Sequence, residues 1–264
     1  MKAGIDFGSS LVKAVWKEEG NYQFFTTADS PLEALPARLR IAGITEITAA
    51  GIGFEKDSSY FSDFTVDRST ENLIEEELAL QVTGVKTLLS PHQLDTFLLV
   101  SLGTGTSYTF VDNEKIIPKM GSGIGGGFIY GLMQMFGIGS FLELSLQSTT
   151  GKNLDLLIKD MLPKTEGIQG EYSIAYFGKA KPNYTKEDAC NTIITTAAKI
   201  TIENIMRIKD KETFDTVVLI GTPLVSIPPL QYLLKGYLPS TGIKPIVPLD
   251  PEYALALGAY HKEK

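Results

Sequence analysis

Two short segments of the chain share one pattern, in which an apolar strand runs into a turn of Gly, Ser and Thr and a second strand leaves it. The first segment, IDFGSSLVKAV, contains Asp6–Lys13, and the second, FLLVSLGTGTSYTFV, contains Ser101–Ser107. Gly has no Cβ and adopts many backbone conformations, so several backbone N–H groups in such a turn can approach one phosphate chain. Each segment alone is equally typical of a plain β-hairpin. The repetition favours a two-lobed fold with a phosphate-binding loop at the start of each lobe.

Helix and strand patterns alternate through the rest of the chain. Short runs rich in β-branched and aromatic residues predict strands, and apolar residues that recur at helical spacing predict helices. The expected strands span residues 2–6, 11–17, 22–27, 46–52, 96–100, 108–111, 216–220 and 243–247. The expected helices span residues 31–41, 72–89, 128–136, 141–147, 153–162, 186–209 and 252–261. This alternation is typical of an α/β fold, with an N-terminal lobe at 1–92 and a C-terminal lobe at 93–264.

The composition excludes several classes of protein. Of 264 residues, 43% are hydrophobic and 21% are charged, which is ordinary for a globular protein and excludes disordered and fibrous chains. The formal net charge of −7 would repel nucleic acid, although oriented backbone N–H groups can still bind a small anion. The single cysteine, Cys190, cannot form an internal disulfide, and no apolar run is long enough to span a membrane. We therefore expect a cytoplasmic protein that binds a small molecule.

The two glycine-containing turns supply candidate nucleotide-binding residues. Asp6, at the end of the first strand, is placed to hold Mg²⁺ directly or through water, and Lys13 on the next strand faces either the nucleotide or solvent. No GxxxxGK[ST] sequence is present, which excludes a P-loop. The residues expected to contact the nucleotide in these turns are Asp6, Gly8, Ser9, Ser10, Lys13, Gly103, Thr104, Gly105 and Thr106.

A third glycine-rich segment, GSGIGGG at residues 121–127, precedes the apolar helix FIYGLMQMF. Glycines at a helix N-terminus let a ligand approach the positive end of the helix dipole, so Gly125, Gly126 and Gly127 are candidate cofactor contacts. A flexible connection between strand and helix is the alternative. Gly221 follows the strand TVVLI, and its position is equally compatible with an adenine-binding edge and with an ordinary turn.

Three consecutive acidic residues, Glu75, Glu76 and Glu77, stand near the start of the helix predicted over 72–89. A kinase needs a base that takes the proton of the attacking hydroxyl, and a carboxylate can supply it. Successive helical side chains point about 100° apart, so at most one or two of the three face a ligand. A solvated acidic helix face is the alternative.

In order, these motifs resemble those of the type II pantothenate kinases, which carry G-I-D-x-G-G-T-x-x-K, V-G-T-G-T-S and a G-G-G helix start. Here the three stand as GIDFGSSLVK, LGTGTS and GSGIGGGFIYGL, and the resemblance continues through STTGKNLDLLIKDML, SIAYFGK, VVLIGTPL and EYALALGAY. The chain is similar to the short bacterial form. The resemblance implies an actin-like (ribonuclease H-like) two-lobed ASKHA kinase fold and a homodimer. It also implies ATP, Mg²⁺ and phosphorylation of the primary hydroxyl of pantothenate, the first step toward coenzyme A.

The resemblance also indicates which carboxylate is catalytic. In the family this residue lies on the helix before the second phosphate loop, seven residues ahead of a glycine. Counting back from Gly84 gives Glu77, with Glu76 in reserve.

The acceptor side of the chain departs from the family pattern. The family arginine that contacts the substrate carboxylate, seven residues before the glycine triplet, is Pro118 here, with Lys119 beside it. Lysine supplies the charge of arginine without its bidentate fork. Ala79 replaces a family carboxylate, and KPIV at 244–247 replaces a tyrosine-bearing segment that reaches the partner subunit. The expected acceptor contacts are Lys119, Gly121 and Ser122, or the helix start at 123–127.

Two alternatives to a pantothenate kinase stay open at this point. One is a kinase for another hydroxylated acceptor, such as a sugar or a pantetheine-like compound. The other is a pseudokinase regulator that binds a nucleotide or an acyl-CoA. The long helix at 186–209 has apolar residues on more than one stripe, which favours packing against a second subunit. The expected partners are thus ATP, a pantothenate-like small molecule and a second copy, with no nucleic acid and no membrane.

Overall fold

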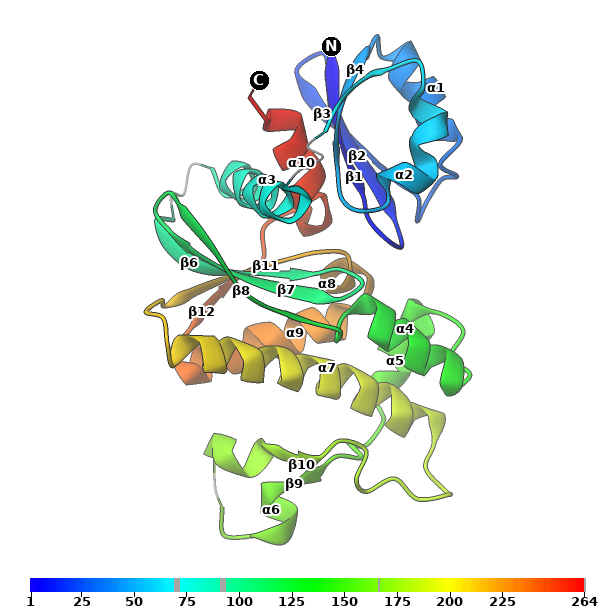
Figure 1. Ribbon diagram of the computed structural model, residues 1–264. Helices are drawn as coiled ribbons and strands as arrows, with labels where there is room; N and C mark the ends of the chain where they lie inside the picture. Colours follow the sequence, from blue (N-terminus) through cyan, green and yellow to red (C-terminus); the bar gives the residue numbers. More distant parts are fainter. Residues whose placement is uncertain (69–71, 91–93, 166, 264) are drawn as a thin grey trace. The chain divides into compact units, whose positions relative to one another are not determined.

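The computed structural model describes residues 1–68, 72–90, 94–165 and 167–263, which form a mixed α/β fold with two five-stranded sheets (Figure 1). The chain divides into two compact units. Unit 1 comprises Met1–Leu99, Thr109–Pro118 and Val247–Lys264, and unit 2 comprises Val100–Tyr108 and Lys119–Ile246. The lobe boundary predicted between residues 92 and 93 lies outside the described residues and stays a prediction.

The first sheet lies in unit 1 and has the strand order β3-β2-β1-β4-β5. Its strands β1, β2 and β3 pair antiparallel, whereas β4 runs parallel to β1 and β5 runs parallel to β4. The carboxyl ends of β1, β4 and β5 therefore meet at one edge, which we call the carboxyl edge and where open α/β sheets bind ligands. The strands are β1 (Lys2–Phe7), β2 (Val12–Glu18), β3 (Asn21–Thr26), β4 (Glu46–Ala50) and β5 (Thr65–Asp67).

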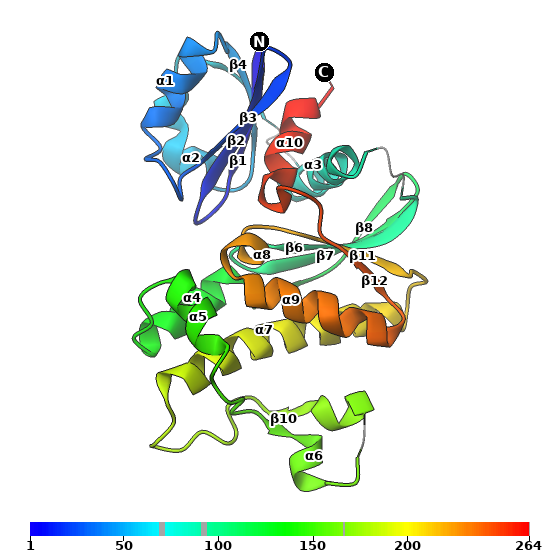
Figure 2. The same cartoon turned by 180° about the vertical axis from the view of Figure 1, so that it is seen from behind.

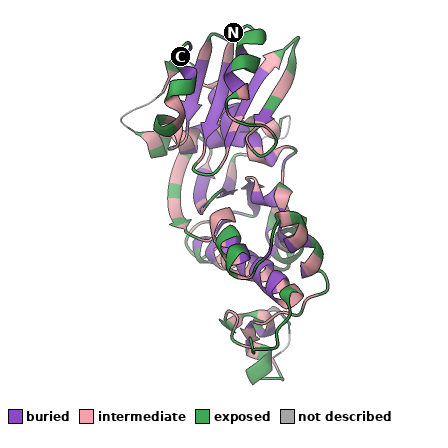
Figure 3. Ribbon diagram, turned by 90° about the vertical axis from the view of Figure 1, so that its right-hand side faces the viewer, coloured by how far each residue is buried: buried purple, intermediate pink, exposed green. Residues whose placement is uncertain are grey.

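Different helices cover the two faces of the first sheet, whose central strands are buried (Figure 3). Ile5 and Phe7 belong to a core cluster that includes residues of α1 (Ala34–Ile41). The other face carries α3 (Leu73–Leu88) and α10 (Ala254–His261), which lie side by side in Figures 1 and 2. Because side chains alternate along a strand, Asp6 faces α3 and α10.

Glycines bring α3, α10 and β1 into direct backbone contact. A Cβ on Gly84 of α3 would lie 1.7 Å from Ala254 O, and one on Gly258 of α10 would lie 1.8 Å from a carbonyl oxygen of α3. A Cβ on Gly4 of β1 would lie 2.1 Å from the backbone of α10. Contacts this short leave no room for a side chain, so glycine is required at all three positions. This packing holds α3 and β1 against the same helix, α10.

The second sheet repeats the order of the first. Its order, read from β8, is β8-β7-β6-β11-β12. The first sheet has the matching order β3-β2-β1-β4-β5, in which three consecutive strands are likewise followed by two later ones. The repeated pattern in the sequence thus corresponds to β1–β2 and β6–β7, which occupy matching places in the two sheets. The strands are β6 (Thr96–Leu102), β7 (Thr106–Asp112), β8 (Lys115–Ser122), β11 (Thr216–Ile220) and β12 (Lys244–Ile246).

The longest helix of unit 2 is α7 (Lys186–Lys209), whose bounds match the prediction. It packs against α5 and α9, as Figure 2 shows for α9. Its apolar residues Ile193, Ile194, Ala197 and Ile205 are buried within this chain, so they give no separate reason for a partner at α7. The homodimer stays a prediction. The other helices are α2 (Phe54–Asp57), α4 (Gly126–Met135), α5 (Phe141–Ser148), α6 (Ile158–Met161), α8 (Pro223–Ser226) and α9 (Pro228–Tyr237), with 3-10 turns at Ser58–Phe61, Gly167–Glu171, Leu238–Thr241 and Pro251–Tyr253.

The helix predicted over 153–162 is wrong in its first half. These residues form β9 (Leu156–Leu157), which pairs with β10 (Ser173–Ala175) before the short α6 begins. The cause is Asp155, which is fully buried and accepts hydrogen bonds from Ser173 Oγ and Phe177 N. A buried carboxylate needs such partners, and these lie 18 and 22 residues further along the chain. A local pattern does not reveal them.

Across the described ranges, none of the helices combines the length and the apolar character that crossing a membrane requires.

Candidate active site

Asp6 is the last residue but one of β1, at the carboxyl edge. The residue is 5% exposed, and its Oδ2 accepts a hydrogen bond from Lys13 Nζ at 2.6 Å. The register of the strands explains the pair, because Asp6 lies opposite Lys13 on antiparallel β2. The Lys13 side chain is itself only 12% exposed. Of the two orientations that the sequence left open for Lys13, the structure places it toward Asp6 and away from solvent.

Glu77 lies near this pair, on the second turn of α3. Burial is the main reason that the pKa of Glu77 is raised to about 7; the Asp6 carboxylate adds to the rise and Lys13 opposes it. A carboxyl with a pKa near neutrality can both take a proton and hold it at neutral pH. The neighbouring acids differ, since Glu75 is exposed and Glu76 pairs with Lys262 at 2.6 Å.

Gln81, one helical turn after Glu77, was not identified from the sequence. Its Nε2 donates a hydrogen bond to Glu77 Oε1 at 3.3 Å, and the residue is buried. Among the described residues, none donates to Gln81 Oε1. The available signal was the spacing of four residues, which places two helical side chains next to each other. Gln81 therefore orients the Glu77 carboxylate.

The first phosphate loop is supported by the segment that follows β4. Gly53 N donates to Phe7 O at 2.8 Å, and a Cβ on Gly51 would lie 2.5 Å from the same oxygen. Gly51 has a φ of +87°, which glycine adopts without strain. Both glycines let the chain that leaves β4 pass directly against the start of the loop at Gly8. The serines at 9–10 in the same loop are exposed. The Gly-x-Gly sequence at residues 51–53, where the predicted strand ends, was the signal for this support.

In unit 2, the glycine triplet packs onto the second phosphate loop. Gly126 N donates to Gly103 O at 2.8 Å, and Gly127 N donates to Thr104 O at 2.9 Å. A Cβ on Gly125 would lie 2.5 Å from another carbonyl of this loop. The backbone N–H groups of Gly126 and Gly127, which were expected to face a ligand, thus donate hydrogen bonds within the protein. The triplet shapes the loop by direct backbone contact, which a flexible connection would not do.

Hydroxyl groups and a further glycine hold the same region. Thr106 Oγ1 is part of a buried residue and donates to Ile124 O at 2.6 Å, while Ser122 Oγ accepts from Ile124 N at 3.1 Å. Gly221 has a φ of +113°, and a Cβ there would lie 1.9 Å from Leu102 O. Glycine at 221 is therefore required by the close approach of the end of β11 to β6.

The predicted acceptor contacts lie together on β8. Lys119 forms an ion pair with Glu212, so a carboxylate already balances its charge. Gly121 is exposed two residues further along the strand. The predicted residues of unit 1 are Asp6, Gly8, Ser9, Ser10, Lys13 and Glu77, and those of unit 2 are Gly103, Thr104, Gly105, Thr106, Lys119, Gly121, Ser122, Gly125, Gly126, Gly127 and Gly221.

The donor set around Asp6 is compatible with a nucleotide-bound Mg²⁺. In the described part of the chain, no group of three or more His, Cys, Asp or Glu side chains is placed to hold a metal ion by itself. Mg²⁺ bound with a nucleotide needs only one or two carboxylates, because phosphate and water oxygens complete its coordination. Asp6 supplies one carboxylate at the carboxyl edge. Glu77 is close enough to it that the Asp6 charge raises the pKa of Glu77.

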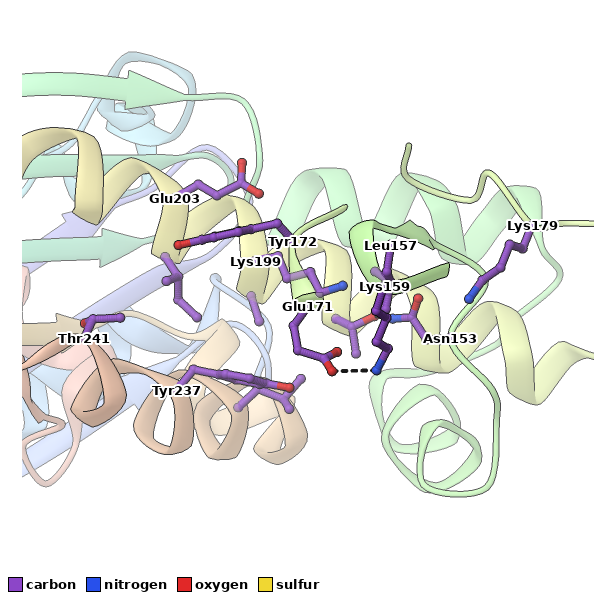
Figure 4. Close-up of a pocket in the computed structure, with 14 residues that line it drawn as sticks. Asn153, Leu157, Lys159, Glu171, Tyr172, Lys179, Lys199, Glu203, Tyr237 and Thr241 are labelled. Atoms are coloured by element: carbon purple, nitrogen blue, oxygen red, sulfur yellow. Dashed lines mark hydrogen bonds and ion pairs between the residues drawn. The ribbon is translucent and has the colours of Figure 1, made fainter. Parts of the chain in front are cut away.

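A separate pocket of about 310 Å³ lies in unit 2 (Figure 4). Tyr172 and Tyr237 line it from opposite sides, and Lys159 pairs with Glu171 at 2.5 Å beside it. Of the residues predicted from the sequence, none lines this pocket. Its three lysines, at 159, 179 and 199, each pair with a carboxylate. We assign this pocket no part in catalysis.

Curated proteins are similar to this chain over its full length, although no family model matches it. The type II pantothenate kinase of Staphylococcus haemolyticus is 25% identical over 276 residues, with 99% of each chain covered. That of Bacillus thuringiensis is also 25% identical, with 97% of this chain and 95% of the relative covered. The resemblance predicted from the motifs is thus confirmed.

Solved structures share the fold. The activator of the 2-hydroxyisocaproyl-CoA dehydratase from Clostridium difficile, with bound ADPNP, has a TM-score of 0.64 at 18% identity and covers 98% of this chain and 92% of its own. A ROK family glucokinase from Streptomyces griseus, in complex with glucose and AMPPNP, has a TM-score of 0.54 at 10% identity and covers 98% of this chain and 97% of its own. These similarities confirm the predicted actin-like α/β fold.

Proposed function

We propose that this protein is a kinase that transfers the γ-phosphoryl group of ATP to the primary hydroxyl of pantothenate. The full-length similarity to type II pantothenate kinases supports the reaction class, and the neighbours bound to ADPNP and AMPPNP support ATP as the donor. The observation that carries the proposal is the group at the carboxyl edge formed by buried Asp6 with the partly buried Lys13 and Glu77. In it, one carboxyl group has a pKa of about 7.

Glu77 is the proposed base. With a pKa of about 7, roughly half of the Glu77 carboxyl groups are ionised at neutral pH. The ionised form takes the hydroxyl proton of the acceptor while the acceptor oxygen bonds to the γ-phosphorus and the bond from that phosphorus to ADP breaks. Gln81 Nε2 holds the carboxylate in place during this transfer.

The phosphate loops and their supports bind the nucleotide. Gly8, Ser9 and Ser10 supply backbone N–H and hydroxyl groups in unit 1, and residues 103–106 supply them in unit 2. Asp6 would hold Mg²⁺, which neutralises phosphate charge when bound, and Lys13 balances the Asp6 carboxylate. The glycines at 125–127 and 221 act by shaping the second loop. Lys119, Gly121 and Ser122 are the proposed acceptor contacts, and we propose a cytoplasmic homodimer.

Phosphate transfer tests the proposal directly. Purified protein with MgATP and pantothenate should form ADP and phosphopantothenate. Glu77→Gln should lower kcat by at least about 100-fold with little change in the Kd for ATP, because only the proton acceptor is removed. Glu75→Gln is the matched control on the exposed side of the same helix and should keep full activity.

Two outcomes would contradict parts of this proposal. An active Glu77→Gln enzyme would exclude Glu77 as the base. A protein that phosphorylates none of pantothenate, pantetheine and N-substituted pantothenamides would exclude the acceptor, and a wider screen of hydroxyl compounds would then separate another kinase from a regulator that only binds ATP.

A further inference from the structure

Gln81 has one hydrogen bond and one unpaired acceptor beside the proposed base. Its Nε2 donates to Glu77 Oε1 at 3.3 Å, across one turn of α3. The residue is 4% exposed, and its own Oε1 is buried without a donor from any residue in the described ranges. A buried polar atom without a partner lowers stability, so we looked for the donor that this oxygen gains when the protein works.

A second pair in the chain has the same spacing and serves as a comparison. In α5, Gln147 Nε2 donates to Glu143 Oε1, also four residues earlier and also at 3.3 Å. There the amide oxygen does have a donor, because Cys190 Sγ lies 3.6 Å from Gln147 Oε1. The two pairs thus share the bond from the amide nitrogen and differ at the amide oxygen.

The two glutamates also differ in the protonation state that their surroundings favour. The backbone N–H of Gly139 is the main reason that the pKa of Glu143 is lowered, so this carboxylate stays ionised near neutral pH. Burial is the main reason that the pKa of Glu77 is raised to about 7. The amide oxygen without a donor therefore stands beside the glutamate that readily carries a proton.

In the described ranges, the groups around Glu77 include no donor for Gln81 Oε1. β1 and β2 contribute Asp6, which raises the pKa of Glu77, and Lys13, which lowers it; Lys13 Nζ is bound to Asp6 at 2.6 Å. The 3-10 turn that precedes α10 contributes Glu252, a carboxyl whose pKa is raised mainly by burial. α10 and β4 meet α3 through apolar side chains. The nearest source of a hydrogen for the amide oxygen is thus Glu77 itself.

We propose that Gln81 Oε1 accepts a hydrogen bond from Glu77 once Glu77 has taken the proton of the acceptor hydroxyl. The inference rests on the proposed function and makes Gln81 a positioning residue for both states of the base. A protonated carboxyl has an O–H donor and an acceptor oxygen, and an amide has an N–H donor and an acceptor oxygen, so the two groups can pair through two bonds.

The proton and the bonds balance in this transfer. The O–H bond of the acceptor breaks and its proton goes to a carboxylate oxygen of Glu77. The acceptor oxygen bonds to the γ-phosphorus, and the bond from that phosphorus to ADP breaks. The new O–H group of Glu77 then donates to Gln81 Oε1, and Gln81 stays neutral throughout.

The raised pKa of Glu77 agrees with this pairing. A hydrogen bond that only the protonated carboxyl makes favours the protonated form, as burial does. Ionisation leaves Gln81 with the bond from Nε2 alone, which is the arrangement that the structure shows. The base thus has a hydrogen-bonded partner before and after it takes the proton.

Side-chain NMR of the metal-free protein, with 13C and 15N in its glutamines, tests the proposal. A hydrogen bond to the amide oxygen moves the 13Cδ resonance downfield, whereas a change at the donor moves 15Nε2. Between pH 9 and pH 5 the 13Cδ resonance of Gln81 should move downfield with a midpoint near 7, the pKa of Glu77. Glu77→Gln should abolish this shift. Gln147 is the matched control, and its 13Cδ resonance should not move, because Glu143 stays ionised.

Gln81→Met supplies the catalytic readout. Met is close to Gln in length, favours a helix and has no amide, so the variant keeps the packing and loses both bonds to Glu77. Its kcat should fall at least about tenfold, while the KM for pantothenate and the Kd for AMPPNP should change less than about twofold. Gln147→Met should keep full activity, and thermal unfolding checks that both variants are folded.

The outcomes separate this inference from the proposed function. A constant 13Cδ resonance of Gln81 with a moving 15Nε2 resonance would show that Gln81 is a donor only, and would overturn the proposal. A raised KM for pantothenate with unchanged kcat in Gln81→Met would assign Oε1 to the acceptor and overturn it as well. Both results leave the proposed function standing if the wild type phosphorylates pantothenate. If the wild type transfers no phosphate but the 13Cδ resonance shifts as expected, the hydrogen bond is supported and the proposed function is what fails.

Discussion

Replacing Glu77, the proposed base, with Gln should make the unliganded protein more stable at alkaline pH. Burial raises the pKa of Glu77 from 4.5 to about 7 in the folded protein. Between these values the folded carboxyl keeps a proton that the unfolded chain has released, so the stability of the wild type falls as pH rises. The difference, 7 − 4.5, is about 2.5 pKa units, or about 3.4 kcal/mol at 1.36 kcal/mol per unit. Gln has a similar shape and does not titrate.

Urea unfolding at pH 5 and pH 8 measures this effect. About 0.8 kcal/mol of the loss has already developed at pH 5, so Glu77→Gln should gain about 2.5 kcal/mol relative to the wild type between the two pH values. Glu75→Gln should follow the wild type, since Glu75 is exposed. If the stabilities of Glu77→Gln and the wild type change with pH in parallel, Glu77 is not a buried carboxyl that holds its proton, and the reasoning is refuted.

Two further predictions concern glycines. Gly84→Ala should lower the free energy of unfolding by about 1–3 kcal/mol, because its Cβ would lie 1.7 Å from a carbonyl of α10. Gly236→Ala, with open space around it, should be neutral or stabilising, and thermal unfolding of both variants measures the difference. Gly125→Ala should raise the Kd for ATP, measured by calorimetry, at least about tenfold, because it displaces the second phosphate loop. Gly131→Ala in α4 should leave this Kd unchanged, and equal effects of the two variants would argue against the role of the triplet.

The sequence predicted the parts of this fold that depend on local pattern. The two strand–turn–strand segments are β1–β2 and β6–β7, and α7 has its predicted bounds, because each is specified by residues close in the chain. β9 was predicted as helix, since only the distant partners of buried Asp155 make an extended segment favourable there. Local pattern does not carry that information.

The candidate site was predictable to a similar degree. The residues alone did not decide which of three glutamates is the base, and the spacing in the family selected Glu77. In the structure the pKa of Glu77 is raised, whereas Glu76 forms an ion pair with Lys262. The hydrogen bond from Gln81 to Glu77 was not identified from the sequence. The use of the triplet amides inside unit 2 was likewise hidden, because a glycine at a helix start can serve a ligand or a neighbouring loop with the same sequence.

The glycine contacts between α3, α10 and β1 have a consequence for synthesis. α10 follows every other element in chain order, and β1 precedes them all. During translation the nascent chain therefore contains β1 and α3 long before the residues that pack on Gly4 and Gly84 leave the ribosome. The helix α3, which carries Glu77, can therefore pack against α10 only after α10 has left the ribosome. A chain released before α10 is made therefore contains every proposed catalytic residue but lacks the helix that packs against α3.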